Sequence, residues 1–121
     1  MKKLLLLFAF ALTTTLSFSQ DISDVSQSGT LLTVRDEKNN QISSKYIGSN
    51  DELCGFSSTI LVIKSGTLVI VYDQKFNQIS SKFIGSSDKV KNISGSNIII
   101  KSGSLVITYD KKWNQISSRY E

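Results

Sequence analysis

The side chains best suited to chemistry recur as a short polar string, of which Ser80, Ser81 and Lys82 form the middle copy. A serine attacks a carbonyl only after a base removes its proton, and this chain has no histidine to act as that base. A lysine could take this role only if burial lowered its pKa. Because the chain also has a single cysteine, histidine and cysteine metal sites and disulfide scaffolds are excluded within one chain. We therefore expect no enzyme, no catalytic residue, no metal site and no cofactor, with a small Ser/Lys hydrolase as the least favoured alternative.

A second polar string, Asp-x-Lys-x-Asn, also occurs three times, and its middle copy runs from Asp73 to Asn77. An aspartate and an asparagine four residues apart could bind a cation or sugar hydroxyl groups. A calcium loop, however, has oxygen ligands at alternate positions, and Lys75, which cannot be such a ligand, occupies one of these positions here. Aspartate often opens a turn by accepting backbone N–H bonds, and asparagine tolerates the left-handed backbone that closes a hairpin. The string therefore predicts a hairpin turn that Asn77 closes.

The fourth position of this turn differs among the copies, and two of them have a large aromatic residue there. Aromatic rings at a loop tip could stack on sugar rings or insert into a partner. In the alternative, each ring folds down over its own hairpin or over the neighbouring sheet, because burial stabilises an aromatic side chain. The candidate ligand-binding residues at the hairpin tips are Asn39, Phe76, Trp113, Asp73, Asp110, Asn77 and Asn114.

All these strings belong to an internal repeat with a period of 37 residues. A Ser-Gly-Thr-Leu string begins at Ser28 and at Ser65, and Ser-Gly-Ser-Leu begins at Ser102. Of 20 aligned positions, 10 are identical in all three copies, so the copies share one local geometry. We expect a single β-repeat domain over residues 20–121, with copies at about 22–48, 49–85 and 86–121.

Each copy has the pattern of short antiparallel strands. The run from Leu68 to Tyr72 is rich in β-branched and aromatic residues, and a polar turn separates it from an alternating segment at 78–83. Strict alternation in that segment would place Ile79 on the face opposite to Ser80 and Lys82. Two shorter extended runs precede the hairpin in the complete copies. The sequence predicts an all-β fold of four-stranded antiparallel meanders, with two full copies and one partial copy.

The runs that are apolar at successive residues, such as Ile98 to Ile100, need cover on both faces of their sheet. The first copy differs, because polar residues replace most of the apolar run upstream of Gly29 and Arg35 replaces a tyrosine. Such replacements allow a terminal repeat to face solvent. The last copy ends at Tyr120 and Glu121 without a similar polar cap, which favours self-association that completes a ring of sheets.

Four short strands per copy, at a period near that of propeller blades, resemble the β-propeller repeat proteins in blade layout. The resemblance covers residues 22–121 and includes no signature motif, and Trp113-Asn114 falls in a turn. It implies sheets that pack face to face, and no functional residue is carried over. Closed propellers have about four to eight blades, so an open stack, closure by self-association, and a three-fold fold of the β-trefoil or β-prism type all remain alternatives.

Residues 1–19 combine Lys2 and Lys3, an apolar run from Leu4 to Leu12 and small residues up to Ser19. This order is typical of a secretory signal peptide of bacterial type, and the apolar stretch is shorter than the ~20 residues of a membrane span. We expect export to the periplasm, the cell surface or the medium, with no membrane insertion after cleavage. Cleavage lowers the formal net charge from +4 to +2, which weakens any argument for a nucleic-acid partner.

The only cysteine, Cys54, is expected to be buried near Leu53 and Phe56. An export signal, a triple repeat and the lack of catalytic residue types together favour a non-enzymatic binding or interaction module. Its ligand would be a glycan or an envelope protein, and repeated weak sites would act together. The alternative is a fragment of a longer propeller-type protein with a structural role only.

Overall fold

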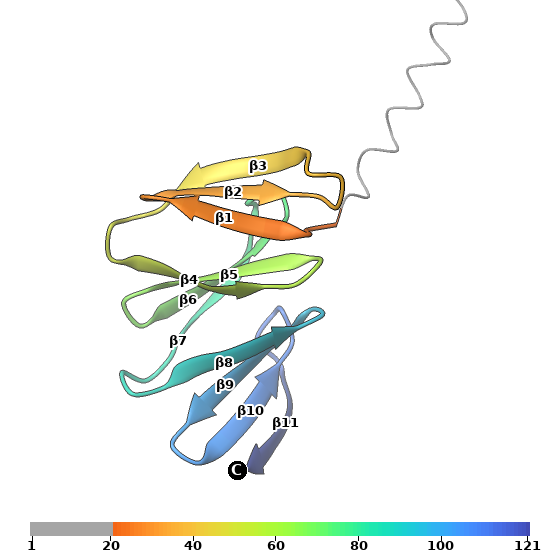
Figure 1. Ribbon diagram of the computed structural model, residues 1–121. Coiled ribbons are helices and arrows are strands. Elements are labelled where there is room, and N and C mark those ends of the chain that lie inside the picture. Colours follow the sequence, from red (N-terminus) through yellow and green to blue (C-terminus); the bar gives the residue numbers. More distant parts are fainter. Residues whose placement is uncertain (1–20) are drawn as a thin grey trace, which may run out of the picture.

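A computed structural model describes residues 21–121 as an all-β structure, with eleven strands and no helix in that range. The strands form three antiparallel sheets that stack as a column (Figure 1). The signal peptide expected at residues 1–19 lies outside the described residues. Within residues 21–121, no helix is long and apolar enough to cross a membrane.

The sheets follow one another along the chain, and every sheet is a meander of neighbouring strands. This confirms the prediction of two complete four-stranded meanders and one partial meander. The first sheet contains β1 (Asp24–Ser28), β2 (Leu31–Arg35) and β3 (Gln41–Tyr46). The second contains β4 (Asp51–Phe56), β5 (Ile60–Ser65), β6 (Leu68–Asp73) and β7 (Gln78–Phe83). The third contains β8 (Lys89–Ser94), β9 (Asn97–Ser102), β10 (Leu105–Tyr109) and β11 (Gln115–Tyr120).

The recurring glycines allow the tight turns between the central strands. Gly66 connects β5 to β6 with a φ of 65°, and Gly103 connects β9 to β10 with a φ of 64°. Two-residue hairpin loops require positive φ because the turn must match the right-handed twist of the strands. Glycine reaches this conformation without a clash from a Cβ atom, which explains why each copy keeps its Ser-Gly pair.

Two hydrophobic clusters hold the column together, one at each junction between sheets. Leu61 and Ile63 of β5 pack against Leu32 and Val34 of the first sheet. On the opposite face of the second sheet, the buried residues Ile60, Val62, Val69 and Val71 pack against Ile98 and Ile100 of the third sheet. The runs that are apolar at successive residues are therefore covered on both faces in the second sheet, as the sequence predicts.

Identical turns link each sheet to the next. The Gly48 amide donates to Asp51 Oδ2 at 2.9 Å, and the Gly85 amide donates to Asp88 Oδ2 at the same distance. A hydrogen bond with Ser65 is the main reason that the pKa of Asp51 lies below its ordinary value, and the Gly48 amide adds to the effect. After the second linker, β8 lies next to β4, the first strand of the preceding sheet. A Cβ atom on Gly55 of β4 would lie only 2.8 Å from Ile93 Cδ1, so the two strands approach closely.

The last strand of each sheet departs from strict alternation because it contains a β-bulge. In β7, Gln78 pairs with Tyr72 and Ser80 pairs with Val71, which leaves Ile79 as the extra residue. Ile79 therefore packs against the cluster between the second and third sheets, on the same side as Ser80. The expectation that Ile79 faces away from Ser80 and Lys82 is wrong, since a bulge turns one side chain toward the other face.

The burial pattern predicts unequal effects for one substitution at two isoleucines. Ile98→Ala removes a fully buried side chain from the junction of the second and third sheets and should lower the free energy of unfolding by about 2–5 kcal/mol. Ile116→Ala, on the exposed β11, is the matched control and should change it by less than about 0.5 kcal/mol. Urea denaturation followed by tryptophan fluorescence measures both. Equal losses would contradict the packing of the third sheet described here.

Candidate functional site

The aspartate of each hairpin tip is occupied by hydrogen bonds within its own turn. Asp73 Oδ1 accepts the amides of Lys75 at 2.8 Å and Asn77 at 2.9 Å, while Asn77 Nδ2 donates to Asp73 Oδ2 at 3.2 Å. Asp110 makes the same three bonds, and those from Asn114 are the main reason that its pKa lies below the ordinary value. Residues 21–121 contain no group of three or more acidic, cysteine or histidine side chains suited to a metal. These bonds support the turn interpretation of the string.

The left-handed residue of each turn is one position earlier than expected. Positive φ angles of 66°, 62° and 68° occur at Asn39, Phe76 and Trp113, and not at the asparagines that end the turns. The carbonyl of each asparagine instead accepts a hydrogen bond from the backbone amide of the aspartate that opens the turn. In the second copy, the Asp73 amide donates to the Asn77 carbonyl at 2.9 Å. The expectation that Asn77 adopts the left-handed conformation is therefore wrong. Its place in the turn fixes both its amide and its carbonyl in hydrogen bonds to one aspartate.

The aromatic rings at the tips fold back onto their own hairpins. Phe76 meets Tyr72 edge-to-face, with ring centroids 5.8 Å apart, and Trp113 meets Tyr109 in the same way at 5.3 Å. Phe76 packs against the cluster between the first two sheets, and Trp113 packs against the cluster between the last two. Both side chains are half-buried, so most of their ring surface serves the junctions between sheets.

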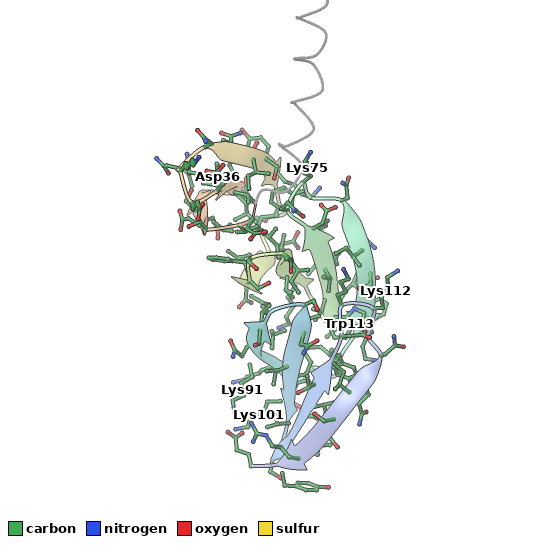
Figure 2. The ribbon with its side chains drawn as sticks, turned by 90° about the vertical axis from the view of Figure 1, so that its right-hand side faces the viewer. Asp36, Lys75, Lys91, Lys101, Lys112 and Trp113 are labelled. Carbon is green, nitrogen blue, oxygen red and sulfur yellow. The ribbon has the colours of Figure 1, made fainter. Side chains whose placement is uncertain are left out.

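The tips of the second and third sheets also reach toward the preceding sheet, which donates one serine hydrogen bond to each tip. The Ser43 hydroxyl donates to the Gln74 carbonyl at 2.7 Å, and the Ser80 hydroxyl donates to the Lys111 carbonyl. In Figure 2, Lys75 at the tip of the second sheet lies level with the first sheet. The candidate nucleophiles Ser43 and Ser80 thus bind main-chain carbonyls at the junctions.

The lysines that follow the serine pairs in the first two copies lie over an aromatic ring of the following sheet. Lys45 Nζ is 5.7 Å from the centroid of the Tyr72 ring, and Lys82 Nζ is 5.5 Å from that of Tyr109. These distances allow attraction between a cation and the face of the ring. The isoleucine, serine and cation of the last strand therefore form one unit at each junction, which we call the junction set.

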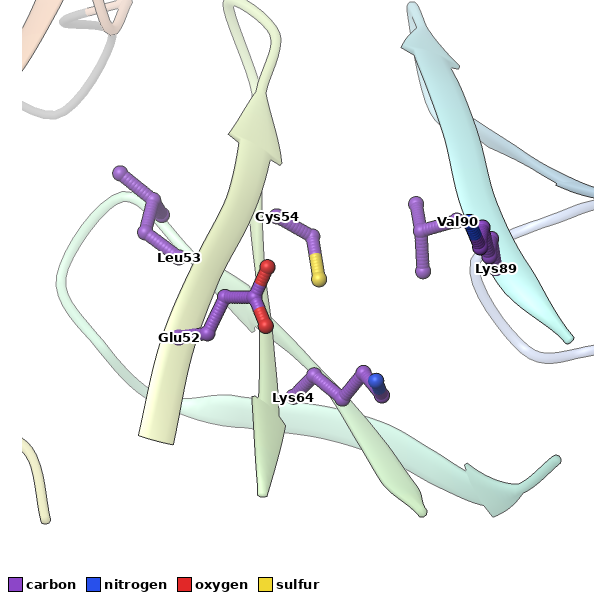
Figure 3. A pocket seen from close by; sticks show the side chains of 6 residues that line it. All are labelled: Glu52, Leu53, Cys54, Lys64, Lys89 and Val90. Atoms are coloured by element: carbon purple, nitrogen blue, oxygen red, sulfur yellow. The ribbon is translucent and has the colours of Figure 1, made fainter. Parts of the chain in front are cut away.

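A small cleft opens between β4 and β8, at the edge where the first strands approach each other. It has a volume of about 330 Å³, and Figure 3 shows Cys54, Glu52 and Lys64 on one side and Lys89 and Val90 on the other. Cys54 is half-buried and packs against the neighbouring cluster, which partly agrees with the expected burial. Burial first, and then the charge of Glu52, raise the pKa of the Cys54 thiol to about 11.

Three aromatic residues that the sequence analysis did not select are the most exposed large hydrophobic residues among residues 21–121. Tyr46, Phe83 and Tyr120 end the last strands of the three sheets and are 72%, 71% and 77% exposed, respectively. They lie 37 residues apart, so each occupies the same place in its sheet. That spacing was the available signal for them. We call these three residues the terminal aromatic residues.

Comparison with known proteins adds no assignment, because no protein-family model matches the chain and no curated protein matches it significantly.

Trp113 has an unusual environment that predicts an asymmetric response to substitution. Its indole Nε1 is buried and finds no hydrogen-bond acceptor among residues 21–121. Trp113→Phe removes this donor, keeps a ring against Tyr109 and copies Phe76, so stability should change by no more than about 1 kcal/mol. Trp113→Ala removes the ring contact and should destabilise by about 2 kcal/mol or more. Thermal unfolding of both variants tests this, and equal destabilisation would show that the ring contact contributes little.

The raised pKa of Cys54 predicts slow modification of the thiol. A thiol must ionise before it reacts with iodoacetamide, and a pKa of about 11 instead of 9.0 lowers the thiolate fraction at pH 8 about 100-fold. Mass spectrometry of the folded chain at timed intervals should show this slowing relative to the chain in urea. Reaction at the rate of the unfolded chain would place Cys54 in solvent instead.

Proposed function

We propose that the protein is an exported, non-enzymatic β-repeat module that binds a glycan polymer through Tyr46, Phe83 and Tyr120. The observation that carries this proposal is their exposure, which exceeds 70% for each of the three rings. Exposed aromatic side chains leave water when they stack on a flat, partly apolar ligand such as a sugar ring. Three equivalent sites suit a ligand that is itself a repeating chain.

The chemistry of the terminal aromatic residues fits weak, additive binding. Each ring lies at a strand end, outside the cleft between β4 and β8, so a single site offers little buried area. A polymer that engages two or three sites gains from effective concentration, because the second contact forms within one complex. The hairpin tips offer less free ring surface, since Phe76 and Trp113 pack against core clusters. For this reason the proposal moves the ligand surface from the tips to the strand ends.

The contacts of the repeated serines and lysines support a structural role for them and not a catalytic one. A nucleophilic serine needs a base beside its hydroxyl group, whereas Ser43 and Ser80 each donate to a backbone carbonyl. Lys45 and Lys82 lie over tyrosine rings of the neighbouring sheets. Both residue types recur because each junction between sheets uses them.

A glycan array probed with the chain from residue 20 to residue 121 tests the proposal. Binding to a polysaccharide should fall about tenfold in each of the variants Tyr46→Ala, Phe83→Ala and Tyr120→Ala, and should be lost in the triple variant. Each ring alone binds the ligand only weakly. The loss of affinity in the triple variant should therefore exceed the loss expected from the three single variants. Because the three side chains are exposed, the fold should survive, which circular dichroism checks.

Ile116→Ala is the matched control, since it removes an exposed apolar side chain that is not aromatic. Its binding should equal that of the unchanged chain. Binding that the triple variant retains would exclude the terminal aromatic residues as the ligand surface. In another outcome, the unchanged chain binds no glycan but binds envelope proteins, and the triple variant does not bind them. This outcome would assign the same surface to a protein partner.

A further inference from the structure

The last strand of each sheet has two polar residues that no contact within the described chain explains. In β7 these are Gln78 and Ser81, which are both exposed, and among residues 21–121 neither side chain forms a hydrogen bond. The residues between them differ, because Ile79 packs into the junction with the third sheet and Ser80 donates to the Lys111 carbonyl. Packing of the stack therefore accounts for Ile79 and Ser80 but not for Gln78 and Ser81.

The same two residue types nevertheless occur in all three copies. They are Gln41 and Ser44 in β3, and Gln115 and Ser118 in β11. All four side chains are exposed, and within the described range none of them forms a hydrogen bond. Because half of the 20 aligned positions differ among the copies, the copies have diverged around this unchanged pair. A role that each copy performs outside the packing of the stack explains why the pair is kept.

The register of the second sheet places Gln78 and Ser81 in one row with Phe83. In β6, the cross-strand partners of Gln78, Ser81 and Phe83 are Tyr72, Ile70 and Leu68, respectively. These partners alternate along β6, and both Tyr72 and Ile70 pack on the face that meets the first sheet. Since Tyr72 and Leu68 are four residues apart, a rise of ~3.3 Å per residue makes the row about 13 Å long. The other two sheets have the same register, and we call the row of glutamine, serine and terminal aromatic residue on each last strand the edge strip.

The edge strip of the second sheet is open to solvent even though another sheet packs on each face of that sheet. β7 lies at the edge of the second sheet, with β6 as its only neighbour within the sheet. The three residues of its strip are all exposed, whereas Tyr72 in β6 is only 9% exposed. The accessibility of this strip therefore results from its place at the edge and does not depend on the residues at either end of the column.

The edge strip offers hydrogen-bonding groups and ring surface but no charge. A glutamine amide and a serine hydroxyl both donate and accept hydrogen bonds, and neither neutralises a charged ligand. The cation of β7, Lys82, points to the opposite face, where it lies over the Tyr109 ring of the third sheet. Lys45 of the first sheet lies over the Tyr72 ring beside Gln78, and that ring attracts the ammonium group. A ligand with hydroxyl groups and a flat apolar face fits these groups best.

The cation beside the first edge strip is also engaged within its own sheet. Arg35, which occupies the position of Tyr72, is the cross-strand partner of Gln41, and its Nη1 donates to the Ser26 hydroxyl at 3.1 Å. Each glutamine end thus has a neighbouring cation with a partner inside the chain. An acidic ligand would have to compete with these contacts, whereas a neutral ligand leaves them intact.

We propose that the edge strips bind a neutral glycan as an extended chain that lies along the last strand of a sheet. This inference rests on the proposed function and specifies its ligand and its polar contacts. The terminal aromatic residue stacks on one sugar ring, while the serine hydroxyl and the glutamine amide form hydrogen bonds with hydroxyl groups further along the glycan. A row of about 13 Å is longer than one sugar ring, so each strip binds more than one sugar unit.

Biolayer interferometry of the chain from residue 20 to residue 121 on immobilised polysaccharides tests the ligand class. The neutral probes are galactomannan, mixed-linkage β-glucan and amylose, and the acidic probes are alginate and polygalacturonate. At least one neutral probe should bind, with the same affinity in ~20 mM and ~300 mM salt, because salt screens only interactions between charges. Binding to the acidic probes alone, or binding that the higher salt abolishes, would show that charge recognition carries the affinity and would overturn the neutral assignment.

Two triple variants test the polar residues of the strips on the neutral probe that binds. One combines Ser44→Ala, Ser81→Ala and Ser118→Ala, and the other combines Gln41→Ala, Gln78→Ala and Gln115→Ala. Each should weaken binding more than about tenfold, because one lost hydrogen bond lowers the affinity of a single strip about fivefold. Ser94→Ala removes an exposed serine from β8, at the other edge of the third sheet, and is the matched control that should bind like the unchanged chain.

The outcomes separate this inference from the proposed function. If removal of the three terminal aromatic residues abolishes binding while both polar triple variants bind like the unchanged chain, the proposed function stands and the edge strip is wrong. If the unchanged chain binds none of the polysaccharides, both are wrong.

Nuclear magnetic resonance of the side-chain amides gives a readout that does not depend on affinity. Oligosaccharides of the neutral probe that binds should shift the NH₂ signals of Gln41, Gln78 and Gln115. Gln27 is the control within the same chain, since it is exposed on β1 and donates to the Gly29 carbonyl, and its signals should stay in place. Unshifted signals of the three strip glutamines, or equal shifts at Gln27, would contradict binding along the strips.

Discussion

Burial of the second sheet on both faces is the constraint on which the rest of the structure depends. Successive residues of β5 point in opposite directions, so Leu61 and Ile63 require one neighbouring sheet while Ile60 and Val62 require another. A single meander cannot supply both, because its strands lie in one layer. The three-sheet column is thus the smallest arrangement of these copies in which one sheet is fully covered, and stability is shared between adjacent copies as in other repeat folds.

The polar contacts at each junction set the position of one sheet on the next, whereas apolar packing alone would tolerate sliding. A serine hydroxyl donates to a tip carbonyl, and a lysine lies over a tyrosine ring of the following sheet. The turn itself places Asn39, Phe76 and Trp113 in the left-handed conformation, which costs a residue other than glycine roughly 1–2 kcal/mol. Edge-to-face contact with a tyrosine, worth about 0.5–1.5 kcal/mol, and partial burial offset this strain.

The sequence was sufficient for the strands, the turns and the number of sheets, because the alternation, the Ser-Gly pairs and the 37-residue period are local or periodic signals. It did not predict which way Ile79 points, since a bulge depends on pairing with Tyr72 and Val71 in another strand. Nor did it single out Phe83, because alternation along one strand does not tell which of its apolar residues is exposed. Its 71% exposure depends on what the neighbouring sheet covers, which is a property of the stack and not of one strand.

The first copy differs from the later ones at positions that face the preceding sheet in those copies, and this difference gives the column a direction. Asp24, Ser26 and Arg35 are polar where the later copies have a leucine or isoleucine, an isoleucine and a tyrosine, respectively, so the first sheet lacks the groups that fill a junction. The third sheet instead retains the isoleucine, serine and cation that hold the following sheet. One end is therefore adapted to water and the other still has the chemistry of an internal junction.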